Sequence, residues 1–99
     1  MALKKAKENK WTFLSNHGHT LIHLHRNPES KVREIAAEVG ITERSALSIL
    51  ADLERDGYIS VERVGRRNSY TIIATKKFRH PNEAKKPISA LLTIFSKNE

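Results

Sequence analysis

The sequence predicts a mainly α-helical domain with one small β-hairpin. Three observations lead to this fold class. Apolar residues recur at helical spacing on both sides of Gly40, β-branched and aromatic residues fill two runs around Gly65, and a last apolar stripe follows Pro87. The 99 residues are enough for one domain with a single modest core.

A first helix is expected from Trp11 to His25, because Asn27-Pro28 then ends it. The residues at helical spacing in this segment are Leu14, Gly18, Leu21, Ile22 and His25.

A second helix is expected over residues 32–39, with Ser30 as its N-cap. Its expected buried residues are Val32, Ile35, Ala36 and Val39. Gly40 follows where the chain turns sharply and where a positive φ favours glycine.

A third helix is expected from Thr42, whose hydroxyl suits an N-cap, to Asp56. A helical wheel places four residues on an inner side: Ala46, Ile49, Leu50 and Leu53. The opposite side is small, polar or cationic and consists of Arg44, Ser48, Ala51 and Arg55, with Ser45 and Leu47 on the flanks.

A hairpin and a final helix complete the expected elements. Residues 58–64 and 69–74 read as strands joined by the four-residue loop Gly65-Arg66-Arg67-Asn68. The final helix carries apolar residues at i, i+3, i+4 and i+7, namely Ile88, Leu91, Leu92 and Phe95. Pro87 suits its first turn, and Asn82 is a candidate cap for a longer version.

The charge is strongly positive and unevenly distributed. The net charge of +7 and the pI near 10.0 favour a polyanionic partner. Residues 1–10 carry four lysines and one glutamate (+3), and residues 76–87 carry five cations and one glutamate (+4). Residues 62–67 sum to +2, whereas residues 27–57 sum to −3. The basic surface is therefore expected on the flanks and the hairpin tip, although a basic tail alone is often only a solvated surface.

The composition also argues against several other classes of protein. There is no cysteine for a disulfide or a thiolate metal site. No apolar run approaches the roughly 20 residues that span a bilayer, and the N-terminus lacks the apolar segment of a signal peptide, so a cytoplasmic protein is expected. No phosphate-binding glycine loop, nucleophile motif or carboxylate pair is visible, so we expect neither an enzyme nor a cofactor.

The chain resembles winged helix-turn-helix transcriptional regulators of the MarR-like and ArsR-like kind over about residues 11–75. The resemblance lies in Ile35-Ala36, Gly40-Ile41, Leu50 and Leu53, whereas Ala46 departs from the larger aliphatic residue common there. The segments WTFLSNHGH and RVGRRNSYTI, with Arg79-His80-Pro81, look like a small single-domain prokaryotic subgroup. The resemblance implies a winged helix-turn-helix DNA-binding domain at residues 11–75. The charge and apolar patterns add a basic N-terminal arm at residues 1–10 and a basic linker with an amphipathic dimerisation helix at 76–99.

The implied function is sequence-specific binding of double-stranded DNA by a transcriptional regulator. A helix about 10–12 Å wide fits the major groove, which is roughly 12 Å across, and the hairpin or wing would reach the flanking backbone or minor groove. The candidate DNA-binding residues are Thr42, Glu43, Arg44, Ser45, Leu47, Ser48, Arg55, Arg63, Arg66, Arg67 and Asn68.

Three of these assignments have alternatives. Arg44 suits either a guanine edge or a phosphate, and Leu47 suits either a thymine methyl group or the core. Strand alternation could turn Arg63 toward Tyr70 or toward solvent instead of DNA.

A twofold dimer is expected, because a reader of this size usually needs two half-sites. The candidate dimer residues are Trp11, Phe13, Leu14, Ile88, Leu91, Leu92 and Phe95. The alternative is that these residues only close the core of the monomer. Any small-molecule or metal effector would have to sit at the dimer interface, and the sequence does not identify one.

Two rival functions stay open. His19 and His23 stand at i, i+4 in the first expected helix, a spacing that suits a metal-responsive repressor, although caps, core hydrogen bonds and solvent exposure are ordinary alternatives. A winged helix can also serve as a protein-interaction module, and RNA is a lesser candidate because no aromatic stacking platform is visible. The operator and the regulated genes are not determined.

Overall fold

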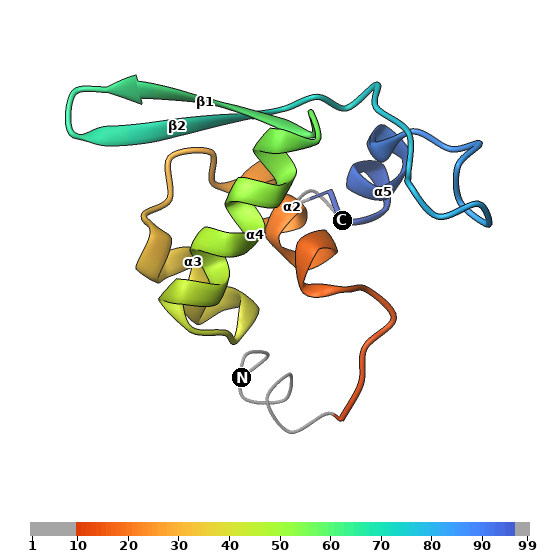
Figure 1. Ribbon diagram of the computed structural model, residues 1–99, viewed down its shortest axis with the longest axis horizontal. Coiled ribbons are helices and arrows are strands. Elements are labelled where there is room, and N and C mark those ends of the chain that lie inside the picture. The colour runs from red at the N-terminus through yellow and green to blue at the C-terminus, as the bar shows by residue number, and fades with distance from the viewer. Residues whose placement is uncertain (1–9, 97–99) are drawn as a thin grey trace.

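The computed structural model describes residues 10–96 and shows a small helical body from which a two-stranded hairpin extends (Figure 1). The elements are α2 (Asn16–Arg26), α3 (Val32–Val39), α4 (Glu43–Arg55), β1 (Ile59–Val64), β2 (Arg67–Ile72) and α5 (Ile88–Ile94). The predicted mainly α class with a small antiparallel hairpin is confirmed. Among the helices of this described part, none combines the length and the apolar character required to cross a membrane.

Helix α2 starts later than predicted and buries a different stripe. It begins at Asn16 instead of Trp11, because the Ser15 hydroxyl accepts a hydrogen bond from the Gly18 amide at 3.2 Å and caps the helix there. Its buried residues are Thr20, Leu21 and Leu24, whereas the predicted His25 is exposed and Leu14, Gly18 and Ile22 are only partly buried. Of the residues predicted at helical spacing, Leu21 is therefore the one that lies in the buried stripe, while Leu14 precedes the helix.

Helix α3 is capped by a different residue from the one predicted. Lys31 is the N-cap, and its amide donates to the Glu34 carboxylate at 2.8 Å, while the Ser30 hydroxyl instead bonds to His23 Nε2 at 2.8 Å. Ile35 and Ala36 are buried, but the predicted Val32 and Val39 are only partly so.

The turn between α3 and α4 follows the expected chemistry. Gly40 has φ +88°, and its amide donates to the Ala36 carbonyl at 2.8 Å. Two residues later the Thr42 hydroxyl accepts from the Ser45 amide at 3.0 Å and starts α4. The predicted inner stripe of α4 is buried and comprises Ala46, Ile49, Leu50 and Leu53.

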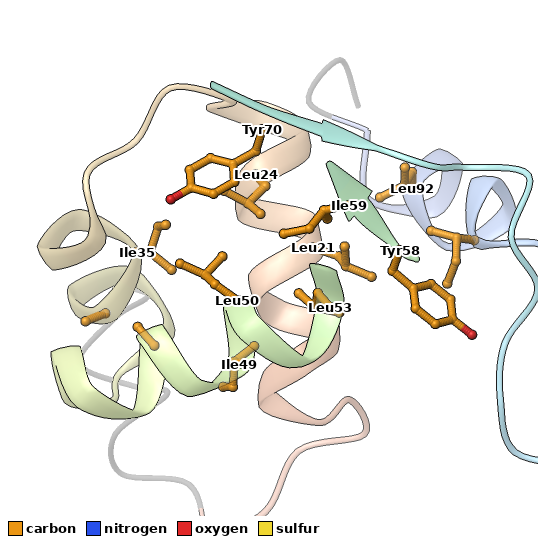
Figure 2. Close-up of a cluster of buried hydrophobic side chains, with 13 residues drawn as sticks. Leu21, Leu24, Ile35, Ile49, Leu50, Leu53, Tyr58, Ile59, Tyr70 and Leu92 are labelled. Carbon is orange, nitrogen blue, oxygen red and sulfur yellow. The ribbon is translucent and has the colours of Figure 1, made fainter. Parts of the chain in front are cut away.

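One hydrophobic core joins the helices to the inner face of the hairpin (Figure 2). Leu21 and Leu24 of α2 point between α4 and the hairpin, where Ile59 and Tyr70 meet them (Figure 2). Leu92 of α5 closes the same cluster from the far side. Among the described residues, no buried side-chain polar atom lacks a hydrogen-bond partner. The buried polar side-chain atoms of this part of the chain therefore all have hydrogen-bond partners within it.

The hairpin is tighter than predicted. Its strands pair from Ile59 opposite Ile72 to Val64 opposite Arg67, so that only Gly65 and Arg66 form the turn. The prediction of a four-residue loop was wrong, because Gly65 at φ +64° supplies the positive φ that a two-residue turn needs at its first position. Arg67 and Asn68 consequently belong to β2.

The segment after β2 folds back before the last helix. An isolated bridge joins Lys77 to Pro87, and α5 begins at Ile88 with Pro87 as its N-cap instead of in its first turn. The longer helix for which Asn82 was a candidate cap does not form, because the Asn82 amide bonds to His80 Nδ1 at 3.1 Å within a turn.

The contrast between Leu24 and Leu47 gives a test of the packing. Leu24 is 1% exposed in the core, whereas Leu47 is 57% exposed on α4. Leu24→Ala should lower the free energy of unfolding by about 2–5 kcal/mol, because it removes buried methyl groups and leaves a cavity. Leu47→Ala should change it by less than about 0.5 kcal/mol. Chemical denaturation measures both, and equal losses would contradict this arrangement of α4.

Candidate nucleic-acid interface

The outer surface of α4 is exposed and carries few acidic groups in its N-terminal half. Arg44, Ser45, Leu47, Ser48 and Ala51 are all exposed. Leu47 is therefore not a core residue, which removes one of the two alternatives for it. An exposed leucine between an arginine and a serine gives this surface both apolar and hydrogen-bonding contacts.

The first residues of α4 have structural tasks of their own. Thr42 caps the helix and also donates from its hydroxyl to Ser45 Oγ at 3.1 Å. Glu43 lies exposed in the first turn, where a negative charge complements the helix dipole. Of the predicted contacts on α4, Arg44, Leu47 and Ser48 therefore have the freest side chains.

The hairpin of residues 59–72, here called the wing, presents three arginines. Arg66 lies at the turn, while Arg63 and Arg67 lie in the strands and are exposed. Arg63 Nε donates to the Gly65 carbonyl at 3.2 Å, and Val61, not Arg63, stands opposite Tyr70. Because Arg63 stands opposite Asn68, it lies on the same face of the wing as Tyr70, and its side chain is exposed there, so both alternatives for Arg63 stay open.

The base of the wing is fastened to the loop of residues 27–31, which precedes α3. The Tyr70 amide donates to the Pro28 carbonyl at 2.8 Å, and Tyr70 is buried. Arg67 Nη1 lies 4.0 Å from Glu29 Oε1 across the gap between wing and loop. These contacts fix the wing relative to the helices, so that the arginines are held at a defined distance from α4.

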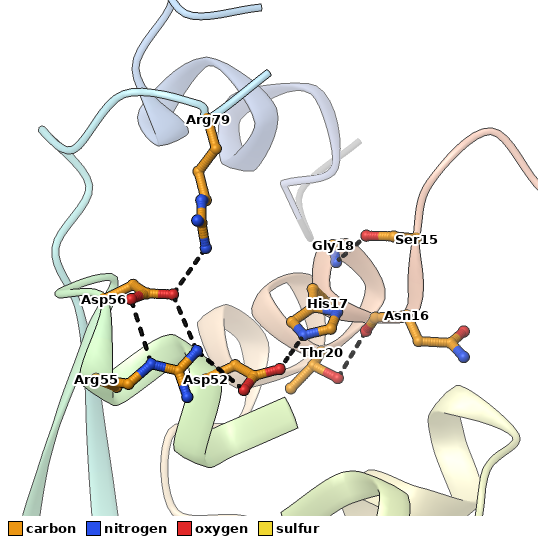
Figure 3. A network of polar contacts seen from close by, with 9 residues as sticks. All are labelled: Ser15, Asn16, His17, Gly18, Thr20, Asp52, Arg55, Asp56 and Arg79. Carbon is orange, nitrogen blue, oxygen red and sulfur yellow. Dashed lines mark hydrogen bonds and ion pairs between the residues drawn. The ribbon is translucent and has the colours of Figure 1, made fainter. Parts of the chain in front are cut away.

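Arg55 is paired instead of free, although the sequence placed it on the outer side of α4. Its guanidinium lies 3.2 Å from Asp52 Oδ1 and 3.3 Å from Asp56 Oδ2. Asp56 also accepts from Arg79 at 2.7 Å, and Asp52 accepts from His17 Nε2 at 2.9 Å (Figure 3). The C-terminal end of α4 thus carries a chain of polar contacts that begins at His17 and ends at Arg79.

This network shifts the pKa values of Asp52, Asp56 and Arg55 in the direction that favours their charged forms. The hydrogen bond from His17 lowers the pKa of Asp52, and the hydrogen bond from Arg55 lowers the pKa of Asp56. Asp56 and then Asp52 raise the pKa of Arg55 above its usual value. Both carboxylates therefore stay ionised, with cationic partners beside them, and the paired Arg55 becomes a weaker candidate for contact with DNA.

The two histidines at metal-ligand spacing each contact a hydroxyl-bearing residue. His23 bonds to Ser30, while His19 Nε2 lies 3.4 Å from Thr12 Oγ1. In the part of the chain that the structure describes, no group of three or more histidine, cysteine or acidic side chains could hold a metal ion. The two histidines therefore have separate structural partners.

The predicted dimer residues divide into two groups. Ile88, Leu91 and Leu92 are buried within the chain itself, as the alternative of a closed monomer core proposed for them. Trp11 and Phe13 are 71% and 93% exposed, with ring centroids 5.2 Å apart. Phe95 is 37% exposed at the end of α5, and Leu14 is half-buried.

A cavity of about 530 Å³ lies between α2, the C-terminal end of α4 and the segment before α5. Its lining includes Phe13 and Leu14 together with the paired His17 and Asp52. The exposed Phe13 therefore lies at the edge of a partly apolar cavity.

The two basic flanks, residues 1–10 and 76–87, differ in what the structure says about their position. The predicted arm at residues 1–10 lies outside the described residues except for Lys10. The basic segment 76–87 lies at the end of the molecule opposite the wing tip (Figure 1). The wing is therefore the basic part that lies near α3 and α4.

Sequence reasoning missed the loop residues Glu29 and Lys31 beside the wing. No local pattern marks them, because their proximity to Arg67 depends on the tertiary fold. The pairing of Arg55 had a visible signal, since Asp52 stands three residues before it on the same helix.

Comparisons with known proteins agree with this geometry. Residues 16–60 match the model of a family described as winged helix-turn-helix DNA-binding. Among solved structures, the chain is similar to MepR of Staphylococcus aureus, a transcription regulator of the multidrug efflux pump MepA. The TM-score is 0.56 at 23% identity, over 96% of this chain and 68% of that one. The predicted winged helix fold is confirmed. The search of curated proteins found no match.

The half-buried His23 gives a prediction about pH. Burial lowers its pKa below 6.5, partly opposed by Glu38 and Glu34. The unfolded chain therefore binds more protons between the two pKa values, so His23 favours folding fully above about pH 6.5 and loses this contribution as the pH falls through the lowered pKa. We expect His23→Gln to make the free energy of unfolding less dependent on pH between 7.5 and 5.

Urea denaturation at each pH measures this effect, with His25→Gln as the control for an exposed histidine of the same helix. Asp52 and Asp56 do not interfere, because their lowered pKa values lie below 3.8. An unchanged pH dependence in His23→Gln would contradict the assignment.

Proposed function

We propose that this chain, whose residues 16–60 match a family described as winged helix-turn-helix DNA-binding, is a transcriptional regulator that recognises a specific double-stranded DNA sequence. The observation that carries the proposal is the combination of an exposed α4 surface that carries few acidic groups with an arginine-bearing wing bonded to the same helical body. The family match supports DNA as the partner. The sequence preference and the regulatory role are the finer parts of the proposal.

Helix α4 reads bases in this proposal. A helix about 10–12 Å wide enters the major groove, and the guanidinium of Arg44 can donate two hydrogen bonds to guanine O6 and N7. Leu47 can contact a thymine methyl group, and the Ser48 hydroxyl can donate to or accept from either base of a pair. Exposure of all three side chains supports this assignment.

The wing contributes affinity more than sequence preference. Arg66 at the turn reaches furthest from the body and would contact phosphates or the adjacent minor groove. Arg55, held by Asp52 and Asp56, is assigned to the structure of the helix end and not to DNA. Charge contacts of this kind weaken with added salt, because bound phosphate releases counterions.

We further propose a homodimer, since two half-sites give a small domain useful affinity. The exposed Trp11 and Phe13, together with Phe95, are the candidate contacts. Ile88, Leu91 and Leu92 are not, because they lie inside the chain. MepR is described as a transcription regulator, and its fold likeness accords with a regulatory role for this chain.

Other roles have less support. A protein-interaction module would not require exposed base-reading side chains beside a basic wing, and the metal-responsive alternative has no ligand cluster within residues 10–96. A binding function without cofactor or catalysis accords with the family match and with the cytoplasmic location expected for a DNA partner.

Substitutions on α4 and on the wing should have different effects. Arg44→Ala or Ser48→Ala should change which sequence is preferred, at about 1–3 kcal/mol for each lost base contact. Arg66→Ala should weaken binding to all duplexes alike and reduce the salt slope by about one unit, because it removes a phosphate contact. Selection from a random duplex library followed by titration of each variant measures both effects.

The control is Lys85→Ala, which removes an exposed cation at the far end of the molecule. Equal losses on selected and random duplexes for every variant would overturn base reading by α4. Absence of any preferred sequence for the unaltered chain would overturn the proposed function itself.

The dimer has its own test. Sedimentation equilibrium should show a dimer at micromolar concentration, and Phe13→Ser should shift it toward monomer because an almost fully exposed ring would leave the interface. Leu47→Ser, which replaces an exposed apolar side chain on α4, is the matched control and should leave the dimer intact. A monomer at that concentration would contradict the proposed dimer.

A further inference from the structure

We infer that the groove between the wing and the loop of residues 27–31 binds a backbone phosphate of the bound DNA through Lys31 and Arg67, and that Glu29 occupies Arg67 when DNA is absent. The inference rests on the proposed function and adds to it a second contact surface. It assigns roles to two loop residues that belong neither to α4 nor to the wing.

The groove has a volume of about 220 Å³ and fixed walls. One wall is the wing, and the other is the loop with the first residue of α3. The Tyr70 amide joins the two walls by its 2.8 Å bond to the Pro28 carbonyl. On the loop side, the Ser30 hydroxyl bonds to His23 of α2 at 2.8 Å. The walls are therefore held apart at a set distance before any ligand arrives.

The lining of the groove is strongly cationic. Four cationic side chains line it, against one acidic one, and these are Lys31, Arg63, Arg66, Arg67 and Glu29. This charge contrasts with the −3 sum of residues 27–57, to which Lys31 belongs. A concave surface with several convergent donors and one sign of charge attracts a compact anion with several acceptor oxygens.

Exposure of the groove favours a backbone phosphate over a small captured anion. The side chains of Arg67 and Glu29 are 61% and 59% exposed, so the groove is open to a partner as large as a duplex. It lies beside the wing, which the proposed function places against the flank of the DNA site. A phosphate on that flank can therefore enter the groove while α4 occupies the major groove.

Glu29 acts as a weak competitor in this arrangement. Its carboxylate lies 4.0 Å from Arg67 Nη1, at the outer limit of an ion pair, and both partners are well exposed. Exposed pairs of this kind contribute little, so a phosphate can replace the carboxylate at low cost. Removing the Glu29 charge should free Arg67 and also remove repulsion of the phosphate.

The test measures the affinity of the full chain for selected and random duplexes as a function of salt. Lys31→Gln should weaken both duplexes about equally and reduce the salt slope by about 0.9, the value for one phosphate. If the variant and the unaltered chain bind equally at 1 M salt, this slope difference makes the affinity of the variant about fivefold lower at 0.15 M salt. Lys85→Gln, the charge-matched control at the opposite end, should cause a clearly smaller loss.

Glu29→Gln should tighten binding to both duplexes, with Glu83→Gln as its charge-matched control. In an Arg67→Gln background the gain from Glu29→Gln should largely disappear, because the two residues act through one contact. Thermal melting checks that every variant folds, as expected for exposed positions.

The outcomes separate the inference from the proposed function. Phosphate binding in the groove would be overturned if Lys31→Gln and Lys85→Gln had equal effects on affinity. It would also be overturned if Glu29→Gln still tightened binding in the Arg67→Gln background. Neither result would contradict sequence-specific binding. If the unaltered chain showed no sequence preference, the proposed function itself would instead be overturned. Saturable binding of inorganic phosphate that requires Lys31, with duplex affinity unchanged by Lys31→Gln, would assign the groove to a free anion and overturn the DNA contact.

Discussion

Helix α2 is the element against which α3, α4, β2 and α5 all pack. Its buried stripe of Thr20, Leu21 and Leu24 makes this possible, because the Thr20 hydroxyl is satisfied by the Asn16 carbonyl at 2.8 Å and can be buried without an unpaired group. The exposed surface of α4 and the position of the wing both follow from this packing. A change that loosens α2 would therefore misplace the base-reading helix and the wing together.

The proposed DNA surface separates the residues that recognise bases from the residues that bind phosphates. Residues 27–57 are net acidic, but Asp52 and Asp56 at the end of α4 are paired with His17, Arg55 and Arg79. Exposed cations lie on the wing, at Lys31 and at Arg44 of α4. Affinity for a polyanion then comes from the edge of the interface, where salt screens it, while the weakly charged surface of α4 is suited to discriminate between bases.

Local signals predicted the elements well where a single interaction decides them. Gly40 and Thr42 set the turn and the start of α4, because a positive φ and a capping hydroxyl are short-range requirements. The start of α2 and the hairpin tip were less predictable, because neighbouring residues compete for the same role. The Ser15 hydroxyl caps α2, so the helix begins after the predicted start at Trp11. Gly65 allows a two-residue turn where the sequence pattern indicated a four-residue loop.

The sequence by itself determined the helix-turn-helix, the hairpin and the inner stripe of α4, since periodicity and turn chemistry are local properties of the chain. Only the tertiary structure decided that Leu47 is exposed, that Ile88 and Leu92 face inward, and that Asp56 is shared between Arg55 and Arg79. It alone brought Glu29 and Lys31 to the wing. These outcomes depend on how separate elements pack and pair their charges, and residues far apart in sequence leave no local pattern from which that packing could be read.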